Sequence, residues 1–278
     1  MNTSNPSDNW RTEAVSVSAH ATIGPDCSIS ASAFIGDSVV LERAVVIGPN
    51  VSVLGQEYES APPTTLYAQA VVGAGSVIYA GVTIGSGALV RPGTVVTRSV
   101  PPGAIVEGNP ATIVGYVDAE RRDDRSARGI ARAELTEVEQ TPVKNVTVHH
   151  FPVIQDLRGN LTVGEFEKQI PFTPRRYFMV FGVPNREVRG EHAHYACHQF
   201  LICVRGSCAV VADDGTKRFE VDLDGPYKGL YLPPMTWGIQ YKYSPDALLL
   251  VFASHYYDAS DYIRNYDQFL ADVKKTNP

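Results

Sequence analysis

Aliphatic side chains recur at every sixth position through the first third of the chain. They form two runs: Val17, Ile23, Ile29, Ile35, Leu41, Ile47 and Val53, and then Val72, Ile78, Ile84, Val90 and Val96. A period of six fits neither a helix nor one long strand. It predicts one short strand per six residues, with tight turns between strands and the aliphatic side chains stacked inside a prism. A chance sandwich of strands would have to explain twelve aliphatic residues in one register.

Two further features of this repeat bear on its geometry. Glycine often follows the aliphatic residue, and we expect it to relieve the corners of the prism. These glycines are Gly24, Gly36, Gly48, Gly73 and Gly85. Residues 54–65, with the sequence LGQEYESAPPTT, break the spacing, so we expect them to leave the prism as a loop.

The pattern changes beyond residue 117. Residues 118–142 carry alternating charges with few large apolar side chains, which indicates a solvated linker. From residue 143 onward, segments such as RRYFMVFGV and DALLLVFAS are separated by turn residues, which predicts many short antiparallel strands. A jelly-roll barrel is the expected architecture of residues 143–278.

The C-terminal segment has a different period. Helical spacing joins Ile263, Tyr266, Leu270 and Val273. Ser260 or Asp261 would cap the resulting helix at its N-terminus. We therefore predict an all-β chain with a short C-terminal helix, in four parts: a flexible N-terminus (1–13), a β-helix (14–117), a charged linker (118–142) and a barrel (143–278).

Composition and charge exclude several classes of partner. The net charge is -6 and the isoelectric point is about 5.6, so no basic field attracts nucleic acid or an anionic membrane. No apolar run reaches the roughly 18–20 residues that span a bilayer. The N-terminus lacks the basic and apolar regions of a signal peptide. Four cysteines, three of them within residues 197–208, do not form a disulfide framework, so we expect a reduced cytoplasmic protein.

The residues most suited to chemistry are three histidines within seven positions, in the segment RGEHAHYACHQF. His192 and His194 point to the same face of a strand, because the side-chain period is two, and His198 is in phase if no bulge intervenes. Three imidazoles suit zinc, iron or nickel, and this spacing resembles the first half of the metal-binding pattern of cupins. The second half should return another histidine where GLYLPPMTWGIQY has Gly238, so we expect no metal.

Several segments of the second half share one resemblance. RGEHAH, QFLICVRGSC, DDG, GLYLPPMTW and ASHYYDASDYIRNYDQF agree in order and spacing with the nucleotide-sugar 3,4-ketoisomerases, which are metal-free cupins acting on dTDP-4-keto-6-deoxyglucose. The similarity runs from about Asn145 to the C-terminus and includes DLRGNL at residues 156–161. It implies a cupin barrel that needs no cofactor for this reaction.

The resemblance also implies roles for particular residues. His194 would be the main base, and His192 would deliver a proton or stabilise an oxygen. Arg176 and Arg189 would hold the diphosphate. Either Tyr256 or Tyr257 would add a hydroxyl to the pocket. For these four residues, surface ion pairs or core aromatics are the alternative interpretation.

The chain departs from the ketoisomerase pattern at three positions. Tyr195 stands where relatives commonly have Lys, and His198 where they often have Glu. Gly238 follows the Trp of PPMTW, where relatives often have His. These departures put the substrate and the stereochemistry of the product in question.

The six-residue repeat resembles the hexapeptide-repeat acyltransferases, which fold as a left-handed parallel β-helix. The resemblance covers about residues 14–117, and its most specific part is the tail VVTRSVPPGAIVEGNPATIVGYV. It implies a trimer that uses acetyl-CoA, with Gln56 and Glu57 of the interrupting loop at the site. A β-helix that only trimerises is the alternative.

Together the two resemblances predict a bifunctional enzyme of deoxyaminosugar synthesis. The cupin would convert dTDP-4-keto-6-deoxyglucose to the 3-keto sugar, a separate PLP aminotransferase would install the amine, and the β-helix would acetylate it. Such sugars enter O-antigens and other glycans. We expect a homo-oligomer with trimer contacts through the β-helix and dimer contacts through the cupin. A metal-dependent cupin and a non-catalytic sugar-binding scaffold remain alternative hypotheses.

Overall fold

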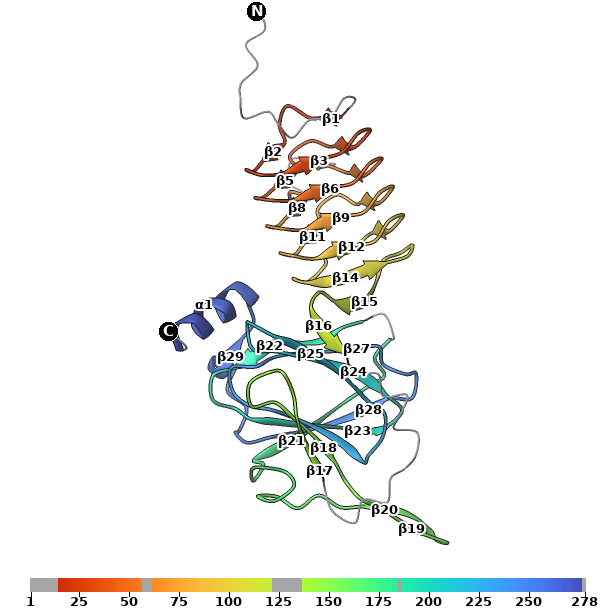
Figure 1. The fold of residues 1–278 in the computed structure, drawn as a ribbon, viewed down its shortest axis with the longest axis vertical. Coiled ribbons are helices and arrows are strands. Elements are labelled where there is room, and N and C mark those ends of the chain that lie inside the picture. The colour runs from red at the N-terminus through yellow and green to blue at the C-terminus, as the bar shows by residue number, and fades with distance from the viewer. Residues whose placement is uncertain (1–14, 57–61, 122–136, 185–186, 277–278) are drawn as a thin grey trace, which may run out of the picture. The chain divides into compact units, whose positions relative to one another are not determined.

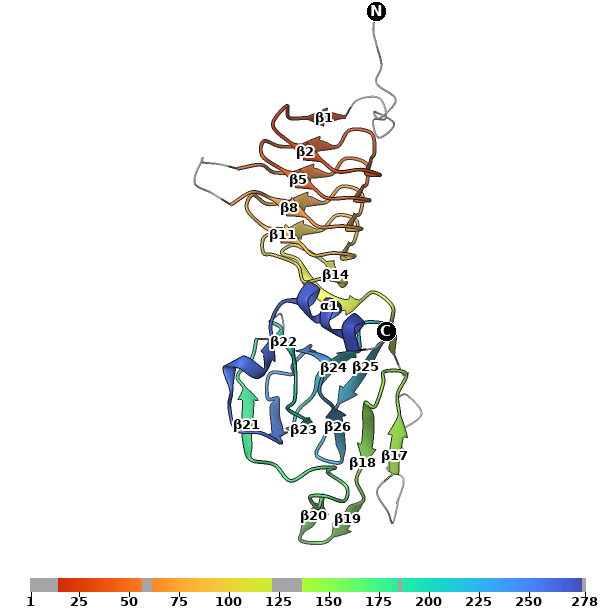
Figure 2. The same ribbon diagram turned by 90° about the vertical axis from the view of Figure 1, so that its left-hand side faces the viewer.

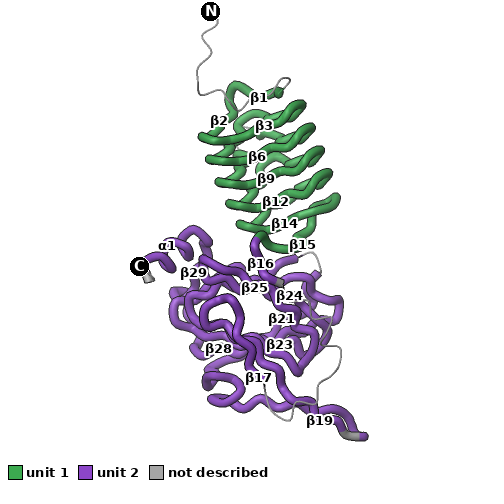
Figure 3. Tube along the Cα trace, viewed as in Figure 1, with its two compact units in different colours: residues 1–117 green, residues 118–278 purple. Residues whose placement is uncertain are grey.

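The computed structural model describes residues 15–56, 62–121, 137–184 and 187–276. The chain divides into two compact units, Met1–Val117 and Asp118–Pro278 (Figure 3). Strands dominate both units, and one α-helix lies near the C-terminus (Figure 1). Within the described residues, no helix has the length and apolar character that crossing a membrane requires.

Unit 1 is a coil of very short strands, which we call the coil. Its strands are β1 (Ser16–Val17), β2 (Thr22–Ile23), β3 (Ser28–Ile29), β4 (Phe34–Ile35), β5 (Val40–Leu41), β6 (Val46–Ile47), β7 (Ser52–Val53), β8 (Thr65–Leu66), β9 (Val71–Val72), β10 (Val77–Ile78), β11 (Thr83–Ile84), β12 (Leu89–Val90), β13 (Val95–Val96), β14 (Ala104–Glu107) and β15 (Thr112–Tyr116). Each strand from β1 to β10 pairs in parallel with the strand three places later, which gives three sheets (Figures 1 and 2). The prediction of one strand per six residues is confirmed.

The alternation within each short strand explains the stack of aliphatic residues. The second residue of the strand points inward, and Ile35, Leu41 and Ile47 are at most 1% exposed. At most turns of the coil, the corner residue three places after the aliphatic adopts a left-handed backbone, as at Asn50 (φ 56°) and Gly87 (φ 64°). The coil therefore tolerates polar residues as well as glycine at these corners.

The glycines that directly follow the aliphatic residues have a different role from the one predicted. They allow neighbouring turns of the coil to approach closely, rather than supplying an unusual backbone angle. A Cβ atom on Gly36 would lie 2.4 Å from the backbone nitrogen of Gly55, which no real Cβ tolerates. One on Gly85 would lie 2.4 Å from the nitrogen of Pro102.

The break in the repeat falls between β7 and β8, and residues 57–61 of the predicted loop lie outside the described residues. Thr64 joins the two sides of this break, because its hydroxyl donates to the carbonyl oxygen of Leu54 at 2.7 Å. The same hydroxyl accepts from the Gly81 amide of the next turn at 2.9 Å. The coil thus continues past the loop without losing register.

Unit 2 contains two six-stranded sheets and a separate hairpin. The strands are β16 (Ala119–Arg121), β17 (Glu137–Gln140), β18 (Thr147–His150), β19 (Val153–Asp156), β20 (Gly159–Thr162), β21 (Arg176–Phe181), β22 (Arg189–His194), β23 (Gln199–Arg205), β24 (Cys208–Asp213), β25 (Arg218–Leu223), β26 (Lys228–Leu232), β27 (Trp237–Tyr241), β28 (Leu248–Ala253) and β29 (Tyr262–Ile263). One sheet has the order β16-β25-β24-β27-β22-β29, and the other β17-β18-β26-β23-β28-β21. Both sheets contribute to one apolar core, for example Val210 and Val221 from the first and Leu201 and Val251 from the second. The unit is therefore a cupin-like sandwich of mostly antiparallel strands.

The segment predicted as a linker, residues 118–142, contributes a strand at each end. β16 pairs with β25, and β17 pairs with β18, so each forms the edge of one sheet. An edge strand bonds on one side only and can carry charged side chains toward solvent, which explains its linker-like composition. Residues 122–136 of the predicted linker and the predicted flexible N-terminus (1–13) lie outside the described residues.

The C-terminal helix starts later than the sequence predicts. α1 spans Tyr266–Thr276, and Asn265 caps it by accepting from the Gln268 amide at 2.9 Å. Ile263 belongs to β29 instead, where it pairs with Ala193 of β22. Ser260 and Asp261 lie in a separate 3-10 helix, Ala259–Asp261. The prediction that one of them caps α1 is therefore wrong.

A buried polar network fixes the start of α1 to the first sheet. The carboxylate of Asp213 on β24 accepts from Arg218 Nε at 2.7 Å and from the Tyr266 hydroxyl at 2.6 Å. The side chain of Asp213 is 3% exposed. Trp237 packs edge-on against the Tyr266 ring, with centroids 5.2 Å apart. These contacts hold the segment that carries Asp261 and Tyr262 against the first sheet of unit 2.

Candidate active site

Two imidazole rings meet on β22. The ring centroids of His192 and His194 are 5.0 Å apart and nearly perpendicular, as the alternation along a strand predicts. His194 is only 4% exposed. A bulge lies directly before the pair, where Gly190 and Glu191 adopt positive φ angles of 83° and 51°. A Cβ atom on Gly190 would lie 2.6 Å from the Gly238 carbonyl oxygen, so this bulge requires glycine.

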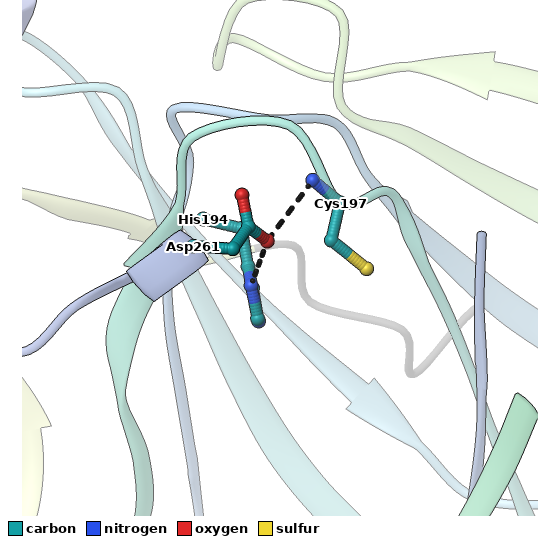
Figure 4. A group of neighbouring side chains, drawn as sticks. All are labelled: His194, Cys197 and Asp261. Atoms are coloured by element: carbon teal, nitrogen blue, oxygen red, sulfur yellow. Dashed lines mark hydrogen bonds and ion pairs between the residues drawn. The ribbon is translucent and has the colours of Figure 1, made fainter. Parts of the chain in front are cut away.

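A carboxylate distant in sequence orients His194. The Nδ1 atom of His194 lies 2.8 Å from Asp261 Oδ2 (Figure 4). Asp261 also accepts from the backbone amides of Ala196 at 2.7 Å and Cys197 at 3.3 Å. Since a carboxylate only accepts, Nδ1 carries the hydrogen and Nε2 is left with its lone pair. The side-chain nitrogen of Gln199 lies 3.1 Å from that Nε2 and donates to it.

Burial keeps both histidines neutral near pH 7. It lowers the pKa of His194 to about 4, although the hydrogen bond that His194 donates to Asp261 acts in the opposite direction. Burial also lowers the pKa of His192, and the Gly190 carbonyl oxygen, 2.8 Å from Nδ1, offsets part of the effect. Two neutral imidazoles in contact can accept a proton and return it, which is general acid–base chemistry.

The stability of unit 2 is expected to fall as the pH drops from 7 to 5. The unfolded chain protonates His194 and His149 below their ordinary pKa of 6.5, whereas the folded chain resists protonation until about pH 4. Stability is therefore complete above pH 6.5 and is lost between pH 6.5 and 4. Each residue should cost about 1–2 kcal/mol at pH 5. Urea unfolding followed by Trp237 fluorescence measures this.

Two comparisons check the origin of this pH effect. His149→Gln should weaken the pH dependence, because burial causes the depressed pKa of His149. Changing the exposed His255 to Gln should leave the dependence intact. Glu191 contributes to the pH dependence of stability with the opposite sign, because burial raises its pKa. An unfolding free energy that is equal at pH 7 and pH 5 in the wild-type chain would contradict the assignment.

His198 does not join the pair, contrary to the in-phase expectation. β22 ends at His194 and β23 begins at Gln199, so His198 lies in the turn between the strands. Its Nδ1 lies 2.6 Å from the Tyr231 hydroxyl, and its ring stacks on Tyr231 at an interplanar angle of 13°. The structure thus brings two of the three histidines together and turns the third toward β26.

One group among the described residues has the donors for a metal ion. The ligand atoms of His194, Cys197 and Asp261 lie within 4.8 Å of one another (Figure 4). The carboxylate of Asp261, however, already accepts three hydrogen bonds from the protein. These bonds orient Asp261 toward His194 Nδ1. The geometry therefore favours a hydrogen-bonded His–Asp pair over a ligand set.

The structure adds Tyr262 to the site, which the sequence analysis missed. The Tyr262 ring lies 4.3 Å from the ring of His194 and 5.0 Å from that of His192, between centroids. Arg176 Nη2 donates to its hydroxyl at 3.3 Å. The guanidinium of Arg264 lies over the same ring, 4.2 Å from its centroid. Two histidines, one tyrosine and two cations therefore form one cluster.

The four predicted substrate-binding residues divide into two pairs. Arg176 is beside the cluster, and its Nε is buried with no hydrogen-bond partner among the described residues. Tyr257 lies under Arg176, 5.4 Å from the guanidinium to the ring centroid, and 5.7 Å from the Tyr262 ring. Arg189 and Tyr256 are both exposed, and neither is placed in contact with the histidine rings.

The two other departures from the ketoisomerase pattern have different consequences. The Tyr195 hydroxyl donates to Asp272 of α1 at 2.9 Å, so this residue ties the end of β22 to the helix. Gly238 is the cross-strand partner of His192. A Cβ atom on Gly238 would meet Leu232 Cδ1 at 3.2 Å. Of the acyltransferase residues predicted in unit 1, Gln56 is described and Glu57 lies outside the described residues.

Comparison with known proteins gives consistent matches to the second half of the chain. The family profile described as FdtA: WxcM-like, C-terminal matches residues 144–274. TDP-4-oxo-6-deoxy-alpha-D-glucose-3,4-oxoisomerase of Aneurinibacillus thermoaerophilus is 43% identical over 130 residues, which cover 47% of this chain and 94% of that protein.

Two solved structures with similar sequences are also 3,4-ketoisomerases. QdtA of Thermoanaerobacterium thermosaccharolyticum, solved as a mutant in complex with TDP-4-keto-6-deoxyglucose, is 36% identical, with 49% of this chain and 98% of that chain covered and a TM-score of 0.47. WlaRB, the TDP-quinovose 3,4-ketoisomerase of Campylobacter jejuni, is 39% identical, with 46% and 99% covered and a TM-score of 0.45. Because the match covers 94% of the Aneurinibacillus relative, the chain belongs to the FdtA (WxcM-like, C-terminal) family.

Proposed function

We propose that unit 2 catalyses the 3,4-ketoisomerisation of dTDP-4-keto-6-deoxyglucose to the 3-keto sugar. The observation that carries this proposal is the neutral His192–His194 pair, with Asp261 behind it, in a segment 43% identical to a 3,4-oxoisomerase. Moving a ketone from C4 to C3 requires removal of the C3 proton and delivery of a proton to C4. The site contains groups suited to both steps.

In this mechanism His194 is the base. Its Nε2 takes the C3 proton, which the adjacent carbonyl acidifies, and an enediolate forms. Asp261 holds the Nδ1 hydrogen and stabilises the imidazolium that results. The protonated His194 then returns a proton to C4, directly or through His192, and the hydroxyl proton on O3 passes to O4, which leaves the ketone at C3. Tyr262 and Arg176 offer a hydroxyl and a guanidinium to the oxygens that carry the developing charge.

Incubation with dTDP-4-keto-6-deoxyglucose in deuterated water tests the proposal. Deuterium incorporation together with a shifted carbonyl supports the isomerase. An inert mixture would favour a non-catalytic sugar-binding scaffold. Activity that chelation removes, with a stoichiometric transition metal in the purified protein, would favour a metal-dependent cupin at His194, Cys197 and Asp261.

We also propose that unit 1 is an N-acetyltransferase with the left-handed hexapeptide-repeat fold. The observation that favours it is the coil of three sheets of parallel strands, whose six-residue spacing is interrupted between β7 and β8. Acetyl-CoA would be the acyl donor, and Gln56 of the loop would lie at the site. A PLP aminotransferase would act between the two units, converting the 3-keto sugar to the 3-amino sugar that unit 1 acetylates. Release of coenzyme A thiol with a dTDP-3-amino-3,6-dideoxyhexose tests this activity.

The protein is further proposed to be a homo-oligomer that uses the outer face of β21. This strand is the edge of its sheet, and its outward residues Tyr177, Met179 and Phe181 are 64%, 47% and 70% exposed. The hairpin β19–β20 exposes Ile154 and Leu161 by 53% and 56%. A two-stranded sheet is marginal on its own, and apolar patches on an open edge favour a second copy as partner.

Replacing Phe181 by Glu is expected to halve the oligomer mass measured by light scattering after gel filtration. The buried charge at a copy-to-copy contact has no partner and disfavours association. Val138→Glu is the matched control, because Val138 is 48% exposed on β17 at the opposite edge of the same sheet. Equal masses for Phe181→Glu and the wild-type chain would place the contact elsewhere.

A further inference from the structure

The lone pair that His194 needs in order to act as a base is already occupied in this structure. Asp261 holds the hydrogen on Nδ1, so Nε2 is an acceptor. The side-chain nitrogen of Gln199 lies 3.1 Å from Nε2. Only the nitrogen of an amide can donate to a lone pair, so this end of the Gln199 side chain faces the ring. His194 can therefore take the C3 proton only after the amide has moved away from Nε2.

The Gln199 side chain has hydrogen-bonding groups to spare. Gln199 is the first residue of β23 and is only 6% exposed. Within the part of the chain that the structure describes, its bond to His194 is the only hydrogen bond of this side chain. The amide oxygen and the second N–H thus have no protein partner there. Buried polar groups without partners cost free energy, which a bound ligand that pairs with them restores.

Strand pairing places Gln199 beside Arg176 on one wall of the site. Both residues are cross-strand partners of Ala253 on β28, one from each side. Residues directly opposite one another in a sheet point to the same face, and the small Ala253 is fully buried between the two long side chains. Arg176 Nε is also buried, with no partner among the described residues. This wall therefore presents an amide and a guanidinium that can donate to the oxygens of a ligand.

We propose that the Gln199 amide caps His194 in the absence of substrate and transfers its hydrogen bond to the C4 oxygen of the sugar when the substrate binds. This inference rests on the ketoisomerase activity proposed above and deepens it. Rotation of the Gln199 side chain exchanges one acceptor, Nε2 of His194, for another, the sugar oxygen. The lone pair of the base is thereby released.

The transfer also serves the chemical step. Removal of the C3 proton places negative charge on the C4 oxygen. A hydrogen bond to a charged oxygen is stronger than a hydrogen bond between neutral groups, so the Gln199 amide binds this oxygen more tightly as the charge develops. Entry of the sugar thus uncovers the base and directs a donor at the charge that the base creates.

Nitrogen NMR of the full-length chain, labelled with ¹⁵N in its histidines, tests the transfer directly. The Nε2 signal of His194 is identified by its loss in His194→Asn. On addition of dTDP-4-keto-6-deoxyglucose this signal should move toward its position in ligand-free Gln199→Met, because both states lack the donated hydrogen bond. Methionine is unbranched, suits a core position and cannot donate. Addition of dTDP alone, which has no hexose, should leave the signal where it is.

Kinetics and a matched variant complete the experiment. Gln199→Met should lower kcat for isomerisation about 10²-fold, the usual loss when one donor to a developing oxyanion is removed, and should leave dTDP binding unchanged. Its Nδ1 signal should still report the hydrogen shared with Asp261, which shows that the site is intact. Gln240→Met is the matched control for the NMR signal. Gln240 is a second buried glutamine, 8% exposed on β27, and no hydrogen bond joins it to His194 in the described residues.

The outcomes separate this inference from the function on which it rests. If the wild-type chain neither incorporates deuterium nor isomerises the sugar, the ketoisomerase proposal is wrong and the role of Gln199 falls with it. If the wild-type chain is active and Gln199→Met keeps its rate, the role of Gln199 alone is overturned. A His194 Nε2 signal that the sugar leaves unmoved in an active wild-type chain has the same consequence.

Discussion

Replacing His194 by asparagine is expected to lower the rate of C3 hydrogen exchange about 10⁴-fold, the upper range for loss of a general base. Asparagine keeps a polar side chain of similar reach but cannot take a proton near neutral pH. The change removes the neutral imidazole that burial and Asp261 prepare. Deuterium incorporation into dTDP-4-keto-6-deoxyglucose, followed by NMR, measures the rate directly.

The matched control for this prediction is His198→Asn. His198 lies four residues away, but its ring stacks on Tyr231 and not on the histidine pair. Exchange by the control should stay within about twofold of the wild-type rate if that geometry holds. Binding of dTDP to His194→Asn should also persist, because no phosphate contact is assigned to His194. Retained exchange in His194→Asn would move the role of base to His192 or Tyr262.

The coil could be predicted from sequence because its contacts repeat at short range. Ten of the twelve aliphatic positions, all except Val17 and Ile23, are buried, so many independent positions report one geometry. The charged edge strands could not be predicted. β16 and β17 are strands because a neighbouring edge is available to them, which depends on tertiary pairing and not on their own residues.

The histidine pair was predictable for a similar local reason. Residues two apart on a strand share a face, and His192 and His194 need only that rule to meet. His198 fails the rule because β22 ends before it. No turn signal in the sequence marks the end of β22. Its pairing with β27 and β29 sets where the strand ends.

Asp261 and Tyr262 could not be assigned from the sequence because tertiary pairing places them. Their segment has helical spacing around Ile263, which suggested a cap and a first helical turn. In the structure, Tyr262 pairs with His194 across β29 and β22, 68 positions apart in the chain. Antiparallel pairing overrides the local helical propensity here. It places both the Asp261 carboxylate and the Tyr262 ring at the site.

Replacing Asp261 by asparagine is expected to lower kcat for isomerisation about 10³-fold with little change in the KM for the sugar. The asparagine amide can donate to Nδ1 of His194, which favours the tautomer with hydrogen on Nε2. In that tautomer Nε2 has no lone pair for the C3 proton, although the ring is still in place. A comparable carboxylate-to-amide change in serine proteases lowers kcat about 10⁴-fold through the wrong tautomer.

A spectroscopic readout distinguishes this mechanism from a loss of structure. In ¹⁵N-labelled protein, the His194 ring signals should report hydrogen on Nδ1 in the wild-type chain and on Nε2 in Asp261→Asn. The variant also loses the carboxylate that raises the pKa of His194 against its burial, so the ring should be harder to protonate. Asp258→Asn is the matched control, because Asp258 caps the same 3-10 helix by accepting from the Ser260 amide at 2.8 Å. Asparagine caps equally well, so this control should keep wild-type activity. An Asp261→Asn protein with an unchanged tautomer and a normal rate would show that His194 acts without its carboxylate.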